Sequence, residues 1–164
     1  MSQTTANLAG YLQTVERLST EIVGLSDAQL KWKPAAHEWS VTEVLTHLAD
    51  HHIVVSFRIR EILSGSSVRL PAFAQDAWVE GQVGNEGSAA EALQLFGALL
   101  HYNHLLYTRL RPADWAKSGV NFRGETLNLV QVIDAFIKHV ELHLAQIQSI
   151  KQALAESYQA VPAV

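Results

Sequence analysis

The hydrophobic residues of this chain recur every three and four positions along four long segments, which is the pattern of amphipathic helices. The segments cover about residues 5–22, 40–63 and 88–110, and a last one that begins near 126 and runs past 154. No convincing alternation of apolar and polar residues separates them, so no β-strand is predicted. The pattern therefore predicts an all-α protein.

Local signals mark where these helices begin and end. Ser40 and Glu43 have the spacing of a capping box at the start of the second helix. The Arg111-Pro112 pair ends the third helix, because proline lacks the backbone N–H that a helix interior needs. Residues 64–87 carry glycines, serines and a proline, and are predicted to form the longest irregular connection, between the second and third helices.

Four helices of this length predict a four-helix bundle, in which binding sites are built from side chains that face the interior. The chain has 164 residues, of which 48% are hydrophobic, and this is enough for one domain with a sizeable core. We therefore treat residues 1–164 as a single domain.

Composition narrows the range of functions. The formal net charge is −4 and no block of like charges stands out, so DNA, RNA and membranes are not expected partners. There is no cysteine, which excludes a disulfide framework and a thiolate ligand, so any metal must be bound by nitrogen and oxygen. The polar start and the lack of a long apolar run predict a cytoplasmic location.

Two histidines lie on the apolar face of the fourth helix. His143 is three residues after Val140 and four before Ile147, and His139 is one helical turn before His143, so both imidazoles share one edge of that face. Glu141 lies two residues from each and faces away, since a helix turns about 100° per residue. This arrangement excludes the His-Glu-x-x-His motif of zinc proteases, where the glutamate stands beside the first ligand.

The second helix offers a third imidazole. His47 lies three residues after Val44 and one before Leu48, on the flank of the inward stripe. His51 shares this flank one turn further along, and we predict that neither His51 nor its neighbour His52 binds a metal directly. The remaining histidines, His37, His101 and His104, are predicted to be solvated.

Three inward histidines together favour a metal site. A single inward histidine is more often a core residue that is satisfied by hydrogen bonds, and this reading stays open for each one alone. Burying three imidazoles without partners would cost about 1–3 kcal/mol for each unsatisfied atom, whereas one ion satisfies a nitrogen on all three. Structural zinc usually has four protein ligands, so His47, His139 and His143 alone predict an open coordination position.

Other polar residues are candidates for supporting roles. Asp50 follows His47 by three residues and Gln146 follows His143 by three, so both could orient a ligand or a water, although a solvated helix surface is the alternative. Asn103 interrupts the apolar stripe of the third helix, where its amide needs partners, and is a candidate for lining the cavity.

Two stretches of the chain resemble the DinB/YfiT-like family of four-helix-bundle proteins. They are LSDAQLKWKPAAHEWSVTEVLTHLAD (25–50) and HVELHLAQI (139–147). The resemblance implies that His47, His139 and His143 bind a divalent metal ion, commonly zinc or nickel. A third stretch, LPAFAQDAWVE (70–80), is similar to a segment near the family's pocket, which makes Asp76 and Trp78 candidate pocket residues.

The resemblance also implies a class of function. Family members include thiol S-transferases that use bacillithiol, mycothiol or glutathione, and metal-dependent hydrolases. We therefore expect an enzyme that activates water or a low-molecular-weight thiol toward a small electrophile, with a catalytic base that is not identified. The alternative is a bundle that binds a metal or small ligand without catalysis. A homodimer is also expected, and the apolar residues Leu93, Gly97 and Leu100 are the candidate contact face.

Overall fold

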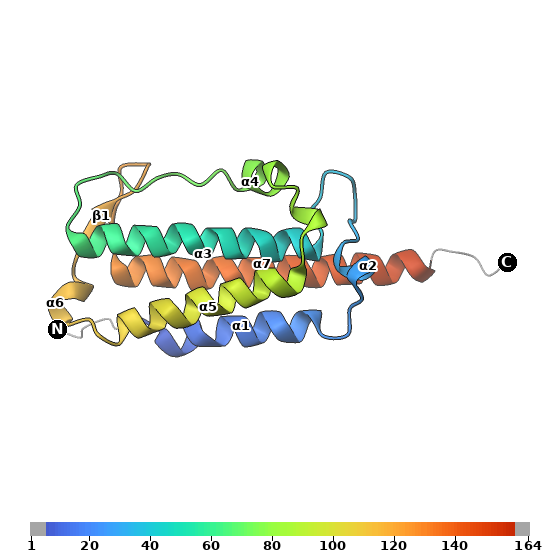
Figure 1. Cartoon of the computed structure of the whole chain (residues 1–164), viewed down its shortest axis with the longest axis horizontal. Helices are drawn as coiled ribbons and strands as arrows, with labels where there is room; N and C mark the ends of the chain where they lie inside the picture. The colour runs from blue at the N-terminus through green and yellow to red at the C-terminus, as the bar shows by residue number, and fades with distance from the viewer. Residues whose placement is uncertain (1–5, 160–164) are drawn as a thin grey trace.

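Four long helices form the body of the protein. The computed structural model describes residues 6–159. The long helices are α1 (Leu8–Ile22), α3 (Val41–Ser64), α5 (Ala89–Tyr107) and α7 (Leu129–Gln159), and they run side by side along the long axis of the molecule (Figure 1). The prediction of an all-α four-helix bundle is confirmed.

Short elements connect the long helices. They are α2 (Asp27–Leu30), α4 (Gln75–Gly81), the 3₁₀ turn η1 (Gly84–Glu86), α6 (Pro112–Trp115), and the strands β1 (Ser118–Val120) and β2 (Thr126–Asn128). The two strands pair antiparallel, with Ser118 opposite Asn128. Within residues 6–159, no helix combines the length and the apolar character needed to cross a membrane.

The start of the last helix was predicted too early. Thr126 belongs to β2, and α7 begins at Leu129. The Asn128 side chain accepts a hydrogen bond from the Gln131 backbone N–H, and the Gln131 side chain accepts one from the Asn128 N–H, each at 2.9 Å. This exchange satisfies backbone donors at the helix start, as a capping box does, and explains why the helix does not extend back into the strand. The predicted start of the first helix, at Thr5, lies outside the described residues.

The connection between α3 and α5 is not irregular throughout. It runs back along α3 and contains the seven-residue helix α4, which lies against α3 (Figure 1). Asn85, near the end of the connection that leads into α5, holds it in place. Its side-chain oxygen accepts a hydrogen bond from Ser40 Oγ at 2.6 Å, and its side-chain nitrogen donates to the Lys31 carbonyl at 3.1 Å. The connection is therefore held in place over one side of α3.

The predicted capping box at the start of α3 is present. The Glu43 backbone N–H donates to Ser40 Oγ at 3.1 Å, and Glu43 Oε2 accepts from the Ser40 N–H at 2.8 Å. Lys33 donates to the same carboxylate at 3.1 Å. The capping box fixes the first turn of α3. His47 follows Glu43 by one helical turn, so the box also fixes the direction in which the His47 side chain points.

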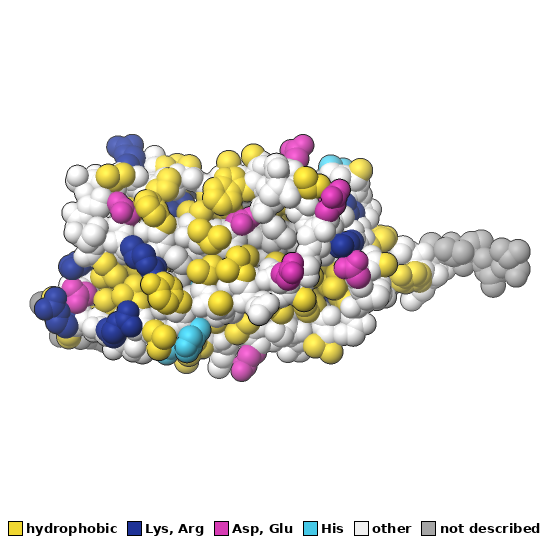
Figure 2. Space-filling view, in the orientation of Figure 1, with side chains coloured by type: hydrophobic (Ala, Val, Ile, Leu, Met, Phe, Trp, Pro, Cys, Tyr) yellow, Lys and Arg dark blue, Asp and Glu magenta, His cyan; other side chains and the backbone are white. Residues whose placement is uncertain are grey.

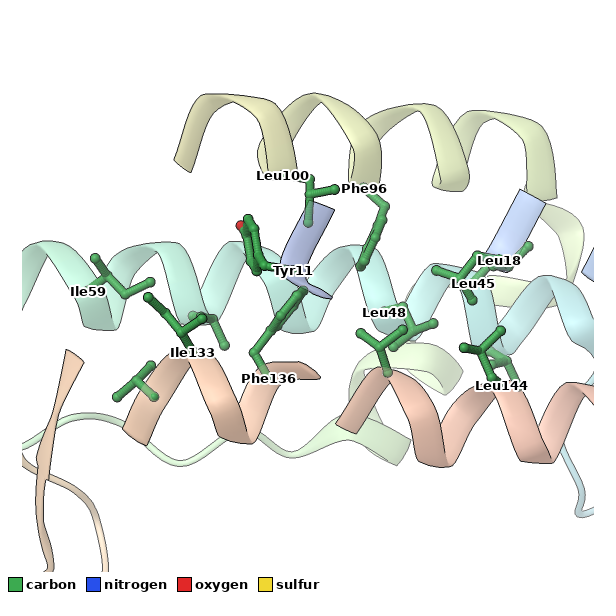
Figure 3. Close-up of a cluster of buried hydrophobic side chains, with 14 of the residues drawn as sticks. Tyr11, Leu18, Leu45, Leu48, Ile59, Phe96, Leu100, Ile133, Phe136 and Leu144 are labelled. Carbon is green, nitrogen blue, oxygen red and sulfur yellow. The ribbon is translucent and has the colours of Figure 1, made fainter. Parts of the chain in front are cut away.

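The core lies between the long helices, and each of them contributes fully buried side chains (Figure 3). Burying one such leucine or phenylalanine stabilises the fold by about 1.5–3 kcal/mol. The largest are Tyr11, Leu18, Leu45, Leu48, Ile59, Ile62, Phe96, Leu100, Tyr107, Leu129, Ile133 and Phe136.

The face proposed for a dimer contact is used inside the bundle. Leu100 is 2% exposed, Leu93 packs against the core, and a Cβ at Gly97 would lie 3.3 Å from the Val15 side chain of α1. The prediction failed because α5 is apolar on most of its sides, so spacing alone could not tell which side faces the bundle. Apolar side chains that do reach the surface are scattered among polar ones on the face shown in Figure 2.

A buried polar cluster lies inside the bundle around His52, which is fully buried. Tyr11 Oη lies 2.8 Å and Asn103 Nδ2 lies 3.2 Å from His52 Nε2. The Asn103 amide nitrogen can only donate a hydrogen bond, so Nε2 of His52 is the acceptor. The imidazole is therefore neutral, with its proton on Nδ1. Asn103 also bonds to Ser56 Oγ at 2.6 Å and to Arg60 Nη1 at 2.9 Å. Burial lowers the pKa of His52 to about 3.

We predict that acid destabilises the fold partly through His52. In the unfolded chain the histidine pKa is about 6.5, so below that pH the unfolded state binds a proton that the folded state does not. The stability that depends on neutral His52 is complete above about pH 6.5 and decreases as the pH falls toward its folded pKa of about 3. At pH 5 the loss from this group is roughly 2 kcal/mol.

The measurement is urea unfolding with a chelator present, at pH 7.5 and pH 5.0. A His52→Gln variant should lose less stability between the two pH values than the wild type does. A His101→Gln variant is the control, because His101 is exposed on α5. Equal losses in the wild type and in His52→Gln would contradict the role given to His52.

Candidate metal centre

Three histidines from two helices meet inside the bundle. His47 comes from α3, and His139 and His143 come from α7. One ring nitrogen of each lies within 4.8 Å of those of the other two. The Nε2 atoms of His47 and His139 are 2.9 Å apart. Nitrogens that converge in this way can share one ion, because zinc–imidazole bonds are about 2.0–2.1 Å long.

Packing of the two helices fixes these positions. Val44 and Leu48 on α3 are fully buried, as are Val140 and Ile147 on α7. These residues alternate with the histidines in sequence and lock the rotation of each helix about its axis. His139 and His143, four residues apart, are therefore presented on one face toward His47.

Burial keeps the imidazoles neutral. It lowers the pKa of His47 to about 3 and that of His139 to about 4, and it also lowers the pKa of His143. Neighbouring imidazoles lower the pKa of His47 and His139 further, because two positive charges so close together repel. Neutral imidazole is the form that binds a metal.

The donor set fits a divalent ion. Two Nε2 atoms only 2.9 Å apart can form at most one hydrogen bond between them, and the buried Nδ1 of His47 has no hydrogen-bond partner. An ion shared by the three rings would satisfy the nitrogens that face one another. A set of three neutral nitrogens suits zinc or nickel better than magnesium or calcium, which prefer oxygen.

Gln146 and Asp50, the two predicted supporting residues, lie in different surroundings. Gln146 Oε1 lies 2.7 Å from His143 Nδ1, which places the ring proton on Nδ1 and leaves the Nε2 lone pair free. Asp50 instead accepts a hydrogen bond from Gln82. Burial raises the pKa of Asp50. Of the two, Gln146 is the residue that the structure brings into contact with the triad.

A cavity of about 420 Å³ opens beside the triad. Its wall includes His143 and Gln146 from α7, and Gln75 and Asp76 from α4. The Trp39 ring stacks on His143 with a centroid separation of 6.2 Å and lines the same cavity. The triad can therefore be approached from this side, along the connection between α3 and α5.

The other predicted pocket residues lie farther from the triad. Trp78 is 44% exposed and packs edge-on against Phe73, which in turn stacks on His47 at 5.6 Å between ring centroids. Asn103 lies in the buried cluster around His52 and does not contact the triad histidines. Phe73 lies in the stretch 70–80 that resembles a pocket segment, but the sequence does not single it out, because one aromatic residue in a loop carries no periodic signal.

The remaining histidines divide between the site and the surface. The His51 ring centroid is 4.1 Å from that of His139, although His51 is not one of the three whose nitrogens converge. His101 is exposed as predicted, and His104 is half-buried. His37 is exposed but also lines the 420 Å³ cavity.

Glu141 points away from the triad, as its spacing predicted. It is exposed and pairs with Arg17 of α1 at 3.0 Å. It therefore cannot act as a base beside the triad in this arrangement.

Comparisons with known proteins agree with this architecture. A family model described as the DinB superfamily matches residues 11–147. YfiT from Bacillus subtilis, described as a probable metal-dependent hydrolase with an unusual four-helix bundle topology, superimposes with a TM-score of 0.82 at 19% identity, covering 90% of this chain and 85% of that one. A mycothiol-dependent maleylpyruvate isomerase superimposes with a TM-score of 0.69 at 11% identity, covering 85% of this chain but 58% of that one. No curated protein matches the sequence significantly.

We predict that the metal-free triad stays neutral under mildly acidic conditions. The lowered pKa values of His47 and His139 mean that neither ring gains a proton at pH 5.5, although a free histidine would be mostly protonated there. Long-range ¹H–¹⁵N spectra of the chelator-treated protein, recorded from pH 7.5 to about pH 5, report the ring nitrogens directly. Protonation of both rings near pH 6.5 would contradict the burial argument.

Proposed function

The chain belongs to the DinB superfamily, and on this premise we propose that it is a metal-dependent enzyme whose divalent ion, zinc or nickel, is bound by His47, His139 and His143. The enzyme uses water or a low-molecular-weight thiol to attack a small electrophilic substrate. In class it is a hydrolase or a thiol S-transferase.

One observation carries the proposal: the triad lies between α3 and α7 with His47 and His143 buried, yet a 420 Å³ cavity reaches His143. A purely structural ion would usually have four protein ligands and no access from a cavity. Here three convergent nitrogens and an adjoining cavity support an ion with a free position that a small molecule can reach.

An ion of this kind supplies Lewis-acid chemistry, which makes water or a thiol a better nucleophile at neutral pH. The protein residues orient the ligands, limit the entry of water and contact a bound molecule. Gln146 holds the His143 ring in one tautomer, and the Phe73 and Trp39 rings cover His47 and His143 and limit the entry of water. Asp76 and His37 line the cavity and offer polar contacts to a bound molecule.

Each nucleophile has support in a similar structure. The similar structure from Bacillus subtilis is described as a probable metal-dependent hydrolase, which supports water as the nucleophile. The similar isomerase is described as mycothiol-dependent, which supports a low-molecular-weight thiol as the nucleophile. The alternative is a bundle that binds an ion or a small ligand without catalysis. The open cavity favours an enzyme over this alternative.

The first test is metal content. We predict that protein purified without a histidine tag binds about one divalent ion per chain, measured by elemental analysis. A His139→Ala, His143→Ala double variant should bind none, because it leaves only one of the three ligands. His101→Ala is the matched control on an exposed helix position and should keep the ion. An ion retained by the double variant would show that the ligands lie elsewhere.

The second test is turnover. The metal-loaded protein, the chelator-treated protein and the double variant are compared in hydrolysis of p-nitrophenyl acetate, and in transfer of glutathione or N-acetylcysteine to 1-chloro-2,4-dinitrobenzene. We expect the loaded protein to exceed both others by about tenfold or more in one of the assays, because a bound divalent ion makes water or a thiol a better nucleophile at neutral pH. Full metal binding without any metal-dependent turnover would favour the non-catalytic alternative.

A further inference from the structure

A second cavity touches the triad from another direction. Its volume is about 230 Å³. It lies between α3, α7 and the β1–β2 hairpin, and its walls are mostly apolar. His51 and His139 line it, so it reaches a member of the triad.

The two cavities have no lining residue in common. On α7, residues from Val132 to His139 line the smaller cavity, and residues from His143 onward line the larger one. The smaller cavity therefore lies toward the N-terminal half of α7, where the hairpin is, and the triad lies between the two.

One cation lines the smaller cavity without an acidic partner. Arg58 on α3 is half-buried, and its Nη2 donates to the Pro71 carbonyl at 2.7 Å. Its Nε is buried and has no hydrogen-bond partner. Within residues 6–159, Arg58 forms no ion pair, and the residues that line this cavity include no aspartate or glutamate.

A half-buried guanidinium whose buried Nε–H has no partner favours an anion as its ligand. Arginine stays charged in proteins, and a carboxylate satisfies its donors in a two-point contact. Burial lowers the pKa of Arg58, which reflects the cost of a charge without a counter-ion in this position. Most of the Lys and Arg side chains on the face in Figure 2 also gather at the end of the bundle where the hairpin lies in Figure 1, which favours the approach of an anion.

We propose that the 230 Å³ cavity binds a small organic carboxylate with an apolar body. The carboxylate pairs with Arg58, the apolar body packs against residues such as Val55, Leu127 and Phe136, and the other end of the molecule lies toward His51 and His139. This inference rests on the proposed function and refines it, because it makes the electrophilic substrate an organic acid that is bound apart from the nucleophile's cavity.

The chemistry favours a carboxylate over a phosphate. A single guanidinium matches one negative charge, and no second cation lines the cavity. The apolar walls offer little to the additional oxygens of a phosphate, which would lose their hydration without compensation.

The test is calorimetric titration of benzoate at pH 7.5, with benzamide as the uncharged analogue and inorganic phosphate as the competing anion. Arg58→Gln removes the charge, and Arg58→Lys keeps it. Arg69→Gln is the matched control, because it removes one charge from an exposed position close to the same cavity. Elemental analysis of each variant shows whether the metal site is intact, so failure of this proposal is distinguished from failure of the metal centre.

We expect benzoate to bind the wild type and Arg69→Gln alike. Binding to Arg58→Gln should be about tenfold weaker or more, as expected for loss of a charge-assisted hydrogen bond, and Arg58→Lys should recover part of it. Benzoate should also shift the ring signals of His51 and His139 rather than those of His37. Equal binding of benzoate and benzamide, stronger binding of phosphate, no effect of Arg58→Gln, or no saturable binding of benzoate up to about 10 mM would each overturn the proposal.

Discussion

The packing of α3 against α7 is the contact on which the rest of the site depends. The two helices are in contact, and the histidines alternate with residues that are fully buried: Val44 and Leu48 on α3, and Val140 and Ile147 on α7. The apolar contacts stabilise the helix pair, and they also determine where the imidazoles lie. A helix rotation of a few tens of degrees would leave much of the apolar contact intact but would separate the three nitrogens.

The bundle interior contains two polar clusters that differ in composition. Around His52, the side chains of Tyr11 and Asn103 bond to Nε2, while the buried Nδ1 has no hydrogen-bond partner. Around His47, the groups that face one another are imidazole nitrogens from three rings, which lie within 4.8 Å of one another. The first cluster is typical of a polar core that fixes helix alignment, and the second has the composition expected of a site that is completed by something bound.

Sequence periodicity was sufficient for the four long helices and for the direction of the three histidines, because both follow from the spacing of apolar residues on α3 and α7. It was insufficient where contacts between distant segments decide the structure. Thr126 joined a short strand because residues 118–120 were available to pair with it. Leu100 was assigned to an outer face because α5 is apolar on most of its sides. The network of His52 and the stacking of Phe73 on His47 join residues that no local pattern connects.

The separate linings of the two cavities have a consequence for how this chain can change. Because no residue belongs to both walls, a substitution near the hairpin leaves the cavity beside α4 unaltered, and the reverse also holds. Each cavity nevertheless reaches one member of the triad, His143 in the larger cavity and His139 in the smaller. Selection can therefore alter the lining of one cavity independently of the other while the three histidines stay in place.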